Sequence, residues 1–334
     1  MDNVQGVGRI LSSTPTTVFP QKIHVSQGAI WYWFEECGCV VKFDPKISKE
    51  VASIPIGDGR SGPYGNPKDM AVDKDAVWVT DAGHSAVLRI DSETNEVAEQ
   101  ISLEVTNTAG KTEQVSPFGL ALDGKTLWVS DFDKNYVIRV DTETKQVVAL
   151  IYDIRNPEGI SVNSDGVWVV EHRSGNIVRI DPATNTITAK ISIPAPKQAT
   201  TNGRCGMCID YVVATEDAVW VPLNLGNGVA RIDPNSNQIS AMVALDFSPR
   251  NLVVTDNAVW AAGGPASPNC GSVPGGVVRI DPQANKLIGT ISIPCAASVG
   301  IYEGNLWIGS GFPGASALTQ IKPDSGIAGL SPGN

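Results

Sequence analysis

The chain has 334 residues, a formal net charge of −10 at pH 7 and a hydrophobic content of 42%. The excess of acidic residues and the lack of a long basic run exclude a nucleic-acid-binding surface, because such a surface needs clustered Lys and Arg. No apolar run approaches the roughly 18 residues of a membrane span. We therefore expect neither a nucleic-acid partner nor a segment that crosses a membrane.

A repeat centred on tryptophan organises the whole sequence. Seven Trp residues stand in apolar, strand-like runs such as Val77-Trp78-Val79, and most copies carry Arg-x-Asp at a fixed distance behind the Trp. The seven are Trp31, Trp78, Trp128, Trp168, Trp220, Trp260 and Trp307. A period of roughly 40–50 residues built from strands is typical of propeller blades. Residues 1–334 are therefore predicted to form one all-β domain, a seven-bladed β-propeller of four-stranded antiparallel blades.

The first predicted strand along the chain, Val7-Gly8-Arg9-Ile10, has no blade of its own. It reads like the outermost strand of a repeat whose three preceding strands are missing. The last repeat, around Trp307, has only the weak segment 327–330 to serve as its fourth strand. We therefore predict that the N-terminal segment pairs with the last blade and closes the ring, which leaves only short strand edges.

Each repeat contains four strands, here called a to d, most clearly in the fourth copy. In that copy the strands are predicted at residues 157–162, 167–170, 176–180 and 186–191. Asp165-Gly166 is a strong hairpin signal between strands a and b, and Asp181-Pro182 begins the turn between strands c and d. The repeated Trp and Asp are interpreted as structural: Trp packs between blades, and Asp makes the turn.

All long insertions and all six cysteines fall in the b–c and d–a loops, which share one face of the disc. The insertions are 55–66, 102–116, 192–208 and 261–275. Variable loops on a rigid scaffold are where binding sites usually lie. This face is therefore the predicted working face.

The cysteines indicate either disulfides or a metal site. Cys270 and Cys295 flank the same blade and are predicted to form a disulfide. Cys205 and Cys208 could close a small ring. Mass spectrometry with and without reductant distinguishes these bonds from free thiols.

Cys37 and Cys39 are so close in sequence that a bond between them is expected to be unusual. The alternative is a four-sulfur zinc site formed with the cysteine pair of the loop entering blade five. The opening residues show no signal region, so the chain is either cytoplasmic or a mature exported protein behind an added Met. The placement of the six cysteines favours the extracytoplasmic (periplasmic or secreted) alternative, with the signal peptide absent from this sequence.

Two positions in each repeat are expected to face the mouth of the central channel. Ten residues before each Trp, at the start of strand a, stand Gln21, Lys68, Phe118, Glu158, Asp210, Arg250 and Ala297. Three residues after each Trp stand Phe34, Asp81, Asp131, Glu171, Leu223, Gly263 and Ser310. Clustered carboxylates can hold a divalent cation through oxygen ligands or supply a general acid and base. The simpler interpretation is a solvated polar rim with some ion pairs.

The repeat resembles two related groups of propeller proteins. Residues 179–191, RIDPATNTITAKI, are similar to the repeat of YVTN-type surface-layer and periplasmic proteins. Trp78-Val79-Thr80-Asp81 and Trp168-Val169-Val170-Glu171 are similar to strand b of the streptogramin B (virginiamycin B) lyase group. The second resemblance implies Mg²⁺ held by glutamates near catalytic histidines at the start of strand a, yet no such position is His in this chain. The lactonase propellers, which bind calcium through Glu, Asn and Asp, are a further likeness.

Two functions follow as alternatives. The first is a small-molecule lyase- or hydrolase-like enzyme with Mg²⁺ or Ca²⁺ as its cofactor. Its predicted residues are Glu158 and Glu171 for the metal, His172 and Asp131 for catalytic proton transfer, and Lys68, Arg250, Asp210 and Asp81 for substrate binding. The second is a non-catalytic exported binding or surface propeller that recognises a protein or glycan through the same loops. The missing lyase histidines favour the second function, whereas the clustered carboxylates favour the first.

Overall fold

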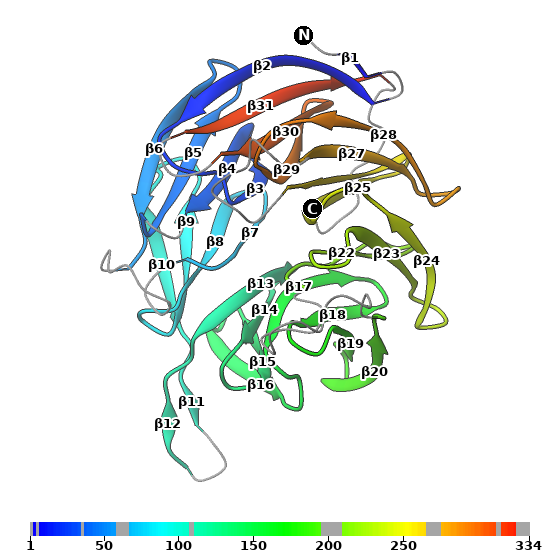
Figure 1. The fold of residues 1–334 in the computed structure, drawn as a ribbon. Helices are drawn as coiled ribbons and strands as arrows, with labels where there is room; N and C mark the ends of the chain where they lie inside the picture. Colours follow the sequence, from blue (N-terminus) through cyan, green and yellow to red (C-terminus); the bar gives the residue numbers. More distant parts are fainter. Residues whose placement is uncertain are drawn as a thin grey trace.

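A computed structural model describes residues 3–4, 7–34, 37–57, 67–106, 110–194, 209–264, 275–311 and 315–324. The described residues form strands and turns without any helix. Seven antiparallel sheets are arranged around a common axis (Figure 1). The predicted seven-bladed β-propeller is confirmed.

The first four blades each contain strands a to d in sequence order. Blade one has β3 (Lys22–Ser26), β4 (Ala29–Phe34), β5 (Cys39–Asp44) and β6 (Lys49–Pro55). Blade two has β7 (Met70–Val72), β8 (Ala76–Asp81), β9 (Ala86–Asp91) and β10 (Val97–Ser102). Blade three has β13 (Pro117–Asp123), β14 (Thr126–Asp131), β15 (Tyr136–Asp141) and β16 (Gln146–Ile151). Blade four has β17 (Pro157–Asn163), β18 (Gly166–Glu171), β19 (Asn176–Asp181) and β20 (Thr186–Ser192).

The last three blades repeat this order, with one exception in blade seven. Blade five has β21 (Val213–Ala214), β22 (Val219–Leu223), β23 (Gly228–Asp233) and β24 (Gln238–Ala244). Blade six has β25 (Pro249–Thr255), β26 (Ala258–Gly263), β27 (Gly276–Asp281) and β28 (Lys286–Ser292). Blade seven has β29 (Ala296–Tyr302), β30 (Asn305–Ser310) and β31 (Ser316–Pro323). A small hairpin of β11 (Val105–Thr106) and β12 (Thr112–Glu113) projects from the connection between blades two and three (Figure 1).

The N-terminal strand completes blade seven, as predicted. Strand β2 (Gly8–Thr16) pairs antiparallel with β31 from Gly8 opposite Pro323 to Thr16 opposite Ser316. The short strand β1 (Asn3–Val4) adds to the outer edge of β2. The N-terminal strands and the last described strand therefore meet in one sheet, and the ring closes through hydrogen bonds between strands.

The repeated tryptophans pack within the ring, and six of the seven are at most 1% exposed. A basic side chain from strand c stacks on several of them: the Arg179 guanidinium lies 5.2 Å from the Trp168 ring. The same guanidinium donates from Nη1 to the Pro234 carbonyl at 2.7 Å in the next blade. Lys42 and Arg139 make equivalent bonds to blades two and four. The repeated basic residue of strand c therefore links neighbouring blades through hydrogen bonds, which is a structural role.

The repeated Asp also has the predicted structural role in the turn after strand c. Oδ1 of Asp181 accepts hydrogen bonds from the backbone N–H groups of Ala183 and Thr184. The turn ends at Asn185, whose φ of 57° is in the left-handed region that Asn tolerates better than most residues. The short turns hold strands c and d in register and leave the opposite face to the longer loops.

Candidate functional site

The starts of the inner strands surround one cavity of about 210 Å³ on the axis. All seven residues that stand ten positions before the repeated Trp line it, as the repeat count predicts. They are Gln21, Lys68, Phe118, Glu158, Asp210, Arg250 and Ala297. We call this space the mouth cavity.

Lys22, Asp69 and Tyr211 also line the mouth cavity, one residue further along their strands. Nζ of Lys22 lies 2.5 Å from Oδ1 of Asp69 and 4.4 Å from the centre of the Tyr211 ring. Burial alone lowers the pKa of Lys22, but the charges and hydrogen bonds of Asp69 and Tyr211 together outweigh burial and raise the pKa overall. Lys22 and Tyr211 also line a second cavity of about 470 Å³ that extends toward the a–b turns. This layer therefore separates the mouth cavity from the rest of the channel.

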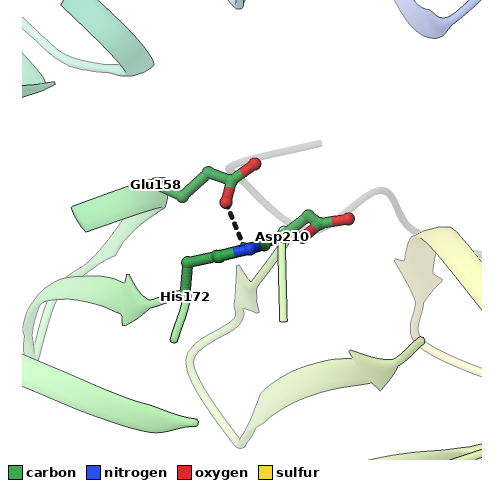
Figure 2. A group of neighbouring side chains, drawn as sticks. All are labelled: Glu158, His172 and Asp210. Atoms are coloured by element: carbon green, nitrogen blue, oxygen red, sulfur yellow. Dashed lines mark ion pairs between the residues drawn. The ribbon is translucent and has the colours of Figure 1, made fainter. Parts of the chain in front are cut away.

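His172 joins two of the mouth carboxylates. Its Nδ1 lies 2.5 Å from Oε2 of Glu158 and 2.9 Å from Oδ1 of Asp210 (Figure 2). Glu158 is the second residue of β17 and His172 directly follows β18 of the same blade, whereas Asp210 precedes β21 of the next blade. The carbonyl of Ile209 approaches the same nitrogen at 3.2 Å. Three oxygen atoms therefore surround one imidazole nitrogen.

The burial of this group changes its acid–base properties. The Glu158 and His172 side chains are 14% and 21% exposed. Burial raises the pKa of Glu158 to about 7, although the nearby imidazolium opposes this shift. Burial would lower the pKa of His172, but Asp210 and Glu158 together raise it to about 10. At neutral pH the imidazole is therefore charged, and Glu158 is the carboxyl that exchanges its proton.

The same three side chains are the group of described residues that could hold a metal ion, since their ligand atoms lie within 4.8 Å of one another. Two carboxylates and an imidazole are suitable ligands for a divalent transition metal and, less well, for Mg²⁺ or Ca²⁺. Two ligand atoms bonded to one ion at about 2.1 Å lie roughly 3 Å apart when the bonds are perpendicular. The 2.5 Å separation of Nδ1 and Oε2 is shorter than this, so an ion would have to move the two groups apart.

The acids that stand three residues after a repeated Trp do not line the mouth cavity; they are Asp81, Asp131 and Glu171. The expectation that this position faces the channel mouth therefore does not hold for them. Glu171 is 1% exposed, and its carboxylate accepts hydrogen bonds from Lys190, Ser174, Asn176 and the backbone of Arg155. These bonds attach the b–c loop to the preceding d–a loop. Burial by itself raises the pKa of Glu171, but Lys190 and the other donors outweigh it and lower the pKa. Glu171 lies outside the group that could hold a metal.

Asp131 and Asp81 have the same structural role in their blades. Asp131 is buried and accepts hydrogen bonds from the backbone N–H groups of Ser116, Asp133 and Lys134. Burial is the main reason that the pKa of Asp131 is raised. Asp81 is 2% exposed and bonds to the backbone and ring nitrogens of His84 in its own loop. The structure therefore places neither predicted residue beside Glu158.

The inward positions that the repeat count missed stand four residues after Trp. His172 is one of them, and Asn224 is its equivalent in blade five: Nδ2 of Asn224 donates to Oδ2 of Asp210 at 2.5 Å. Phe132, its equivalent in blade three, packs edge-on against the His172 ring with the centroids 5.7 Å apart. Side chains alternate along a strand, so positions two and four after Trp share a face and position three does not. That alternation was the available signal.

Lys68 and Arg250 lie on either side of the acidic pair around the mouth cavity. Nζ of Lys68, at the start of blade two, lies 5.9 Å from the centre of the Phe118 ring of blade three. The two cations therefore flank the carboxylates, and their predicted role in substrate binding stays a prediction.

One cysteine expectation is overturned within the described residues. Cys37 and Cys39 form a disulfide with Cα atoms 5.2 Å apart, although they are two residues apart in sequence. Residue 38 is glycine with a φ of 57°, a conformation that lets the chain turn between the two sulfurs. The same bond excludes these two residues from a four-sulfur zinc site. Cys205, Cys208 and Cys270 lie outside the described residues, so the pairing of Cys270 with Cys295 stays a prediction.

No family model and no curated protein matches the chain. Among solved structures, a streptogramin B lyase matches with a TM-score of 0.70 and 12% identity, covering 94% of this chain and 97% of that one. The protein U3-55K also matches with a TM-score of 0.70 and 12% identity, covering 96% of this chain and 100% of its own. At this identity the likeness shows the propeller fold and does not define an activity. No helix in the described part of the chain could cross a membrane.

Proposed function

We propose that the protein is a small-molecule enzyme of the lyase or hydrolase type, with Glu158, His172 and Asp210 as its acid–base group. The observation that supports this most directly is the position of the His172 imidazole between two carboxylates at the edge of the mouth cavity. A buried charged group of this kind costs stability unless it is paired, and strongly shifted pKa values in a cavity are typical of functional sites.

In this proposal Glu158 transfers the proton. It lines the cavity, and its pKa of about 7 lets it both accept and release a proton near neutral pH. His172 positions Glu158 and stabilises its ionised form, whereas the negative charge of Asp210 opposes that ionisation and keeps the pKa of Glu158 raised. Asn224 holds the Asp210 carboxylate in place through the hydrogen bond of 2.5 Å that its Nδ2 donates to Oδ2. Asp131 has no part in this scheme, because its carboxylate is bound to backbone N–H groups of its own loop region.

A divalent cation is the alternative occupant of this group. Glu158, His172 and Asp210 would hold it, in place of the predicted pair of Glu158 with Glu171. When bound, it would polarise an oxygen of the substrate. Equilibrium dialysis followed by metal analysis tests this: wild-type protein and Glu171→Gln should retain the ion, and Glu158→Gln should lose it.

Turnover is tested with a panel of small esters, lactones and hydroxy acids. The rate should fall by a factor of about 10² to 10⁴ in Glu158→Gln and stay unchanged in Glu96→Gln, whose side chain is exposed and far along blade two. Equal rates in wild type and Glu158→Gln would contradict the proposal. Thermal unfolding of each variant shows whether a loss of rate reflects a loss of fold.

The second candidate is a non-catalytic propeller that binds a protein or glycan through the loop face. The equal similarity to U3-55K and to a streptogramin B lyase supports keeping it, because the fold by itself favours neither. An extracytoplasmic location is part of both candidates, and the Cys37–Cys39 disulfide supports it because disulfides persist in oxidising compartments. Detection of the protein in culture supernatant or periplasmic extract tests the location.

A further inference from the structure

The second cavity of the channel lies on the side away from the acid–base group. It has a volume of about 470 Å³ and extends from Lys22 and Tyr211 to the a–b turns of blades three to five. We call it the channel cavity. Its volume lies within the roughly 300–1,000 Å³ that is usual for sites that bind small molecules, whereas the mouth cavity, at about 210 Å³, is smaller.

Apolar side chains from three neighbouring inner strands form one wall of the channel cavity. Strands β7, β13 and β17 each contribute two of them. They are Met70, Val72, Leu120, Leu122, Ile160 and Val162. The second member of each pair is only half-buried. A ligand with an apolar body would remove this surface from water, which is favourable.

His24 is a titratable residue of this cavity that the proposed reaction does not use. It stands two residues after Lys22 on β3, so the alternation of side chains puts both on the same face of the strand. Burial lowers the pKa of His24 well below its usual range, and the charge of Lys22 adds to this effect. The imidazole is therefore neutral at pH 7 and offers one N–H donor and one acceptor nitrogen.

The two ring nitrogens of His24 differ in their access to the cavity. Nε2 is buried without a hydrogen-bond partner, so a ligand does not reach it. Nδ1 also has no partner among the described residues, but it is not buried. The side chain lines the channel cavity and is half-buried as a whole. Nδ1 is therefore the nitrogen that can meet a ligand.

Tyr211 supplies a second polar atom to the same end of the cavity. Its hydroxyl interacts with the Lys22 ammonium, and the charge of Lys22 also acts on His24. A phenol oxygen that accepts a hydrogen bond keeps its own O–H as a donor. No described residue accepts a hydrogen bond from this O–H. The inner end of the cavity therefore offers a phenol donor and an imidazole nitrogen.

The charges around the cavity favour an uncharged ligand. Lys22 and Asp69 form an ion pair at the inner end, with Nζ and Oδ1 2.5 Å apart, so the two charges balance each other. Asp123 and Glu216 line the cavity at the a–b turns and are exposed, which disfavours the entry of an anion. A cationic group at the inner end would be a buried charge without a carboxylate of its own, which is unfavourable.

We infer that the channel cavity binds an uncharged alcohol or phenol with an apolar body. The ligand hydroxyl accepts a hydrogen bond from the O–H of Tyr211 and forms a second one with Nδ1 of His24. A hydroxyl group suits either tautomer of the imidazole, because it both donates and accepts. The body lies along the apolar wall toward the a–b turns. This site is independent of the proposed function, since none of its contacts belongs to Glu158, His172 or Asp210.

Binding is measured by isothermal titration calorimetry with 4-phenylbutan-1-ol as the probe. The comparison ligands keep the same body and carry a methyl ether, a carboxylate (4-phenylbutyrate) or an ammonium group (4-phenylbutylamine). We expect the alcohol to bind at least about tenfold more tightly than the two charged ligands and about threefold to tenfold more tightly than the ether, which cannot donate. A carboxylate or an amine that binds as tightly as the alcohol would overturn the inference.

Nuclear magnetic resonance of the imidazole nitrogens locates the bound alcohol. The chain has three histidines, so the signals of His24, His84 and His172 can be followed separately. Saturating 4-phenylbutan-1-ol should shift the ring nitrogens of His24 and leave those of His84, which is outside the cavity, unchanged. Unchanged His24 signals at saturation would overturn the inference, and a shift confined to His172 would place the alcohol in the mouth cavity instead.

Two variants with matched controls assign the contacts. Tyr211→Phe removes the hydroxyl, and His24→Phe removes the ring nitrogens; each should lower the affinity for the alcohol about threefold to tenfold. Tyr152→Phe and His84→Phe make the same changes at exposed side chains outside the cavity and should leave the affinity unchanged. Unchanged affinity in both cavity variants would contradict the assignment. Where a cavity variant does not fold, the His24 signals of the wild-type protein decide.

Discussion

Nδ1 of His172 lies 2.5 Å from Oε2 of Glu158, and Asp210 of the next blade approaches the same nitrogen at 2.9 Å. The first two residues come from one blade, and the third comes from its neighbour. The relative position of two blades therefore sets the geometry of the acid–base group. Changes at the blade interface and changes in the group itself should have separable effects, which the following predictions use.

The stability of the protein should depend on the protonation of Glu158. Burial raises its pKa to about 7 from the ordinary value of 4.5. The folded state therefore holds a proton that the unfolded state releases between these values, so the stabilisation is complete below about 4.5 and is lost as pH rises through about 7. Relative to wild type, the free energy of unfolding of Glu158→Gln should rise by about 1–3 kcal/mol from pH 5 to pH 8. Urea unfolding at a series of pH values measures this, and a difference that does not vary with pH would contradict it.

Glu171→Gln should destabilise the fold without a specific effect on turnover. The variant weakens a partly buried ion pair with Lys190 at 2.6 Å and the bonds between two loops. We expect a loss of about 1–3 kcal/mol at pH 7. Because the pKa of Glu171 is lowered in the folded state, its stabilisation is present above the unfolded pKa and is lost as pH falls through the folded value. A double-mutant cycle with Lys190→Gln measures the pair, and a fall in kcat without a fall in stability would instead indicate a role in catalysis.

Arg179→Gln should loosen the contact between blades four and five. The variant removes the bond at 2.7 Å to the Pro234 carbonyl and the stacking on Trp168. The expected cost is about 1–3 kcal/mol of unfolding free energy. Differential scanning calorimetry should show a lower Tm. Lys286→Gln, at the edge of blade six, is the control and should unfold like wild type, since its side chain is exposed.

Gly8→Ala should weaken the closure of the ring. Gly8 has a φ of 152°, and a Cβ at this position would lie 2.5 Å from the carbonyl oxygen of Lys322. Strain of this kind costs about 1–3 kcal/mol. Hydrogen exchange should be faster in β2 and β31 of the variant than in the wild type, while blades three to five keep their protection. Uniform exchange rates in both proteins would show that this pairing does not limit opening.

The sequence predicted the number of blades, the four strands of blade four and the closure by residues 7–10 because these depend on local signals. Trp recurs at a fixed position in each repeat, and Asp makes the turn after strand c. A single strand at the N-terminus can pair only with the free edge of the incomplete last blade. The count of ten residues before Trp also located the mouth cavity, since strand a always starts at the same distance. The count of three residues after Trp selected Glu171 and Asp131, which are bound within their loops, because it ignored the alternation of side chains.

What the sequence determined by itself is the repeat: its fold, its structural Trp and Asp residues, and the seven positions at the channel mouth. The tertiary structure decided which of these groups meet. It joined His172 to Asp210 across a blade boundary, attached Glu171 to Lys190 and left the buried indole N–H of Trp33 without a hydrogen-bond partner among the described residues. Periodicity fixes where a residue stands within its own blade. Contacts between blades depend on the twist of each sheet and the packing between sheets, which no repeat count contains.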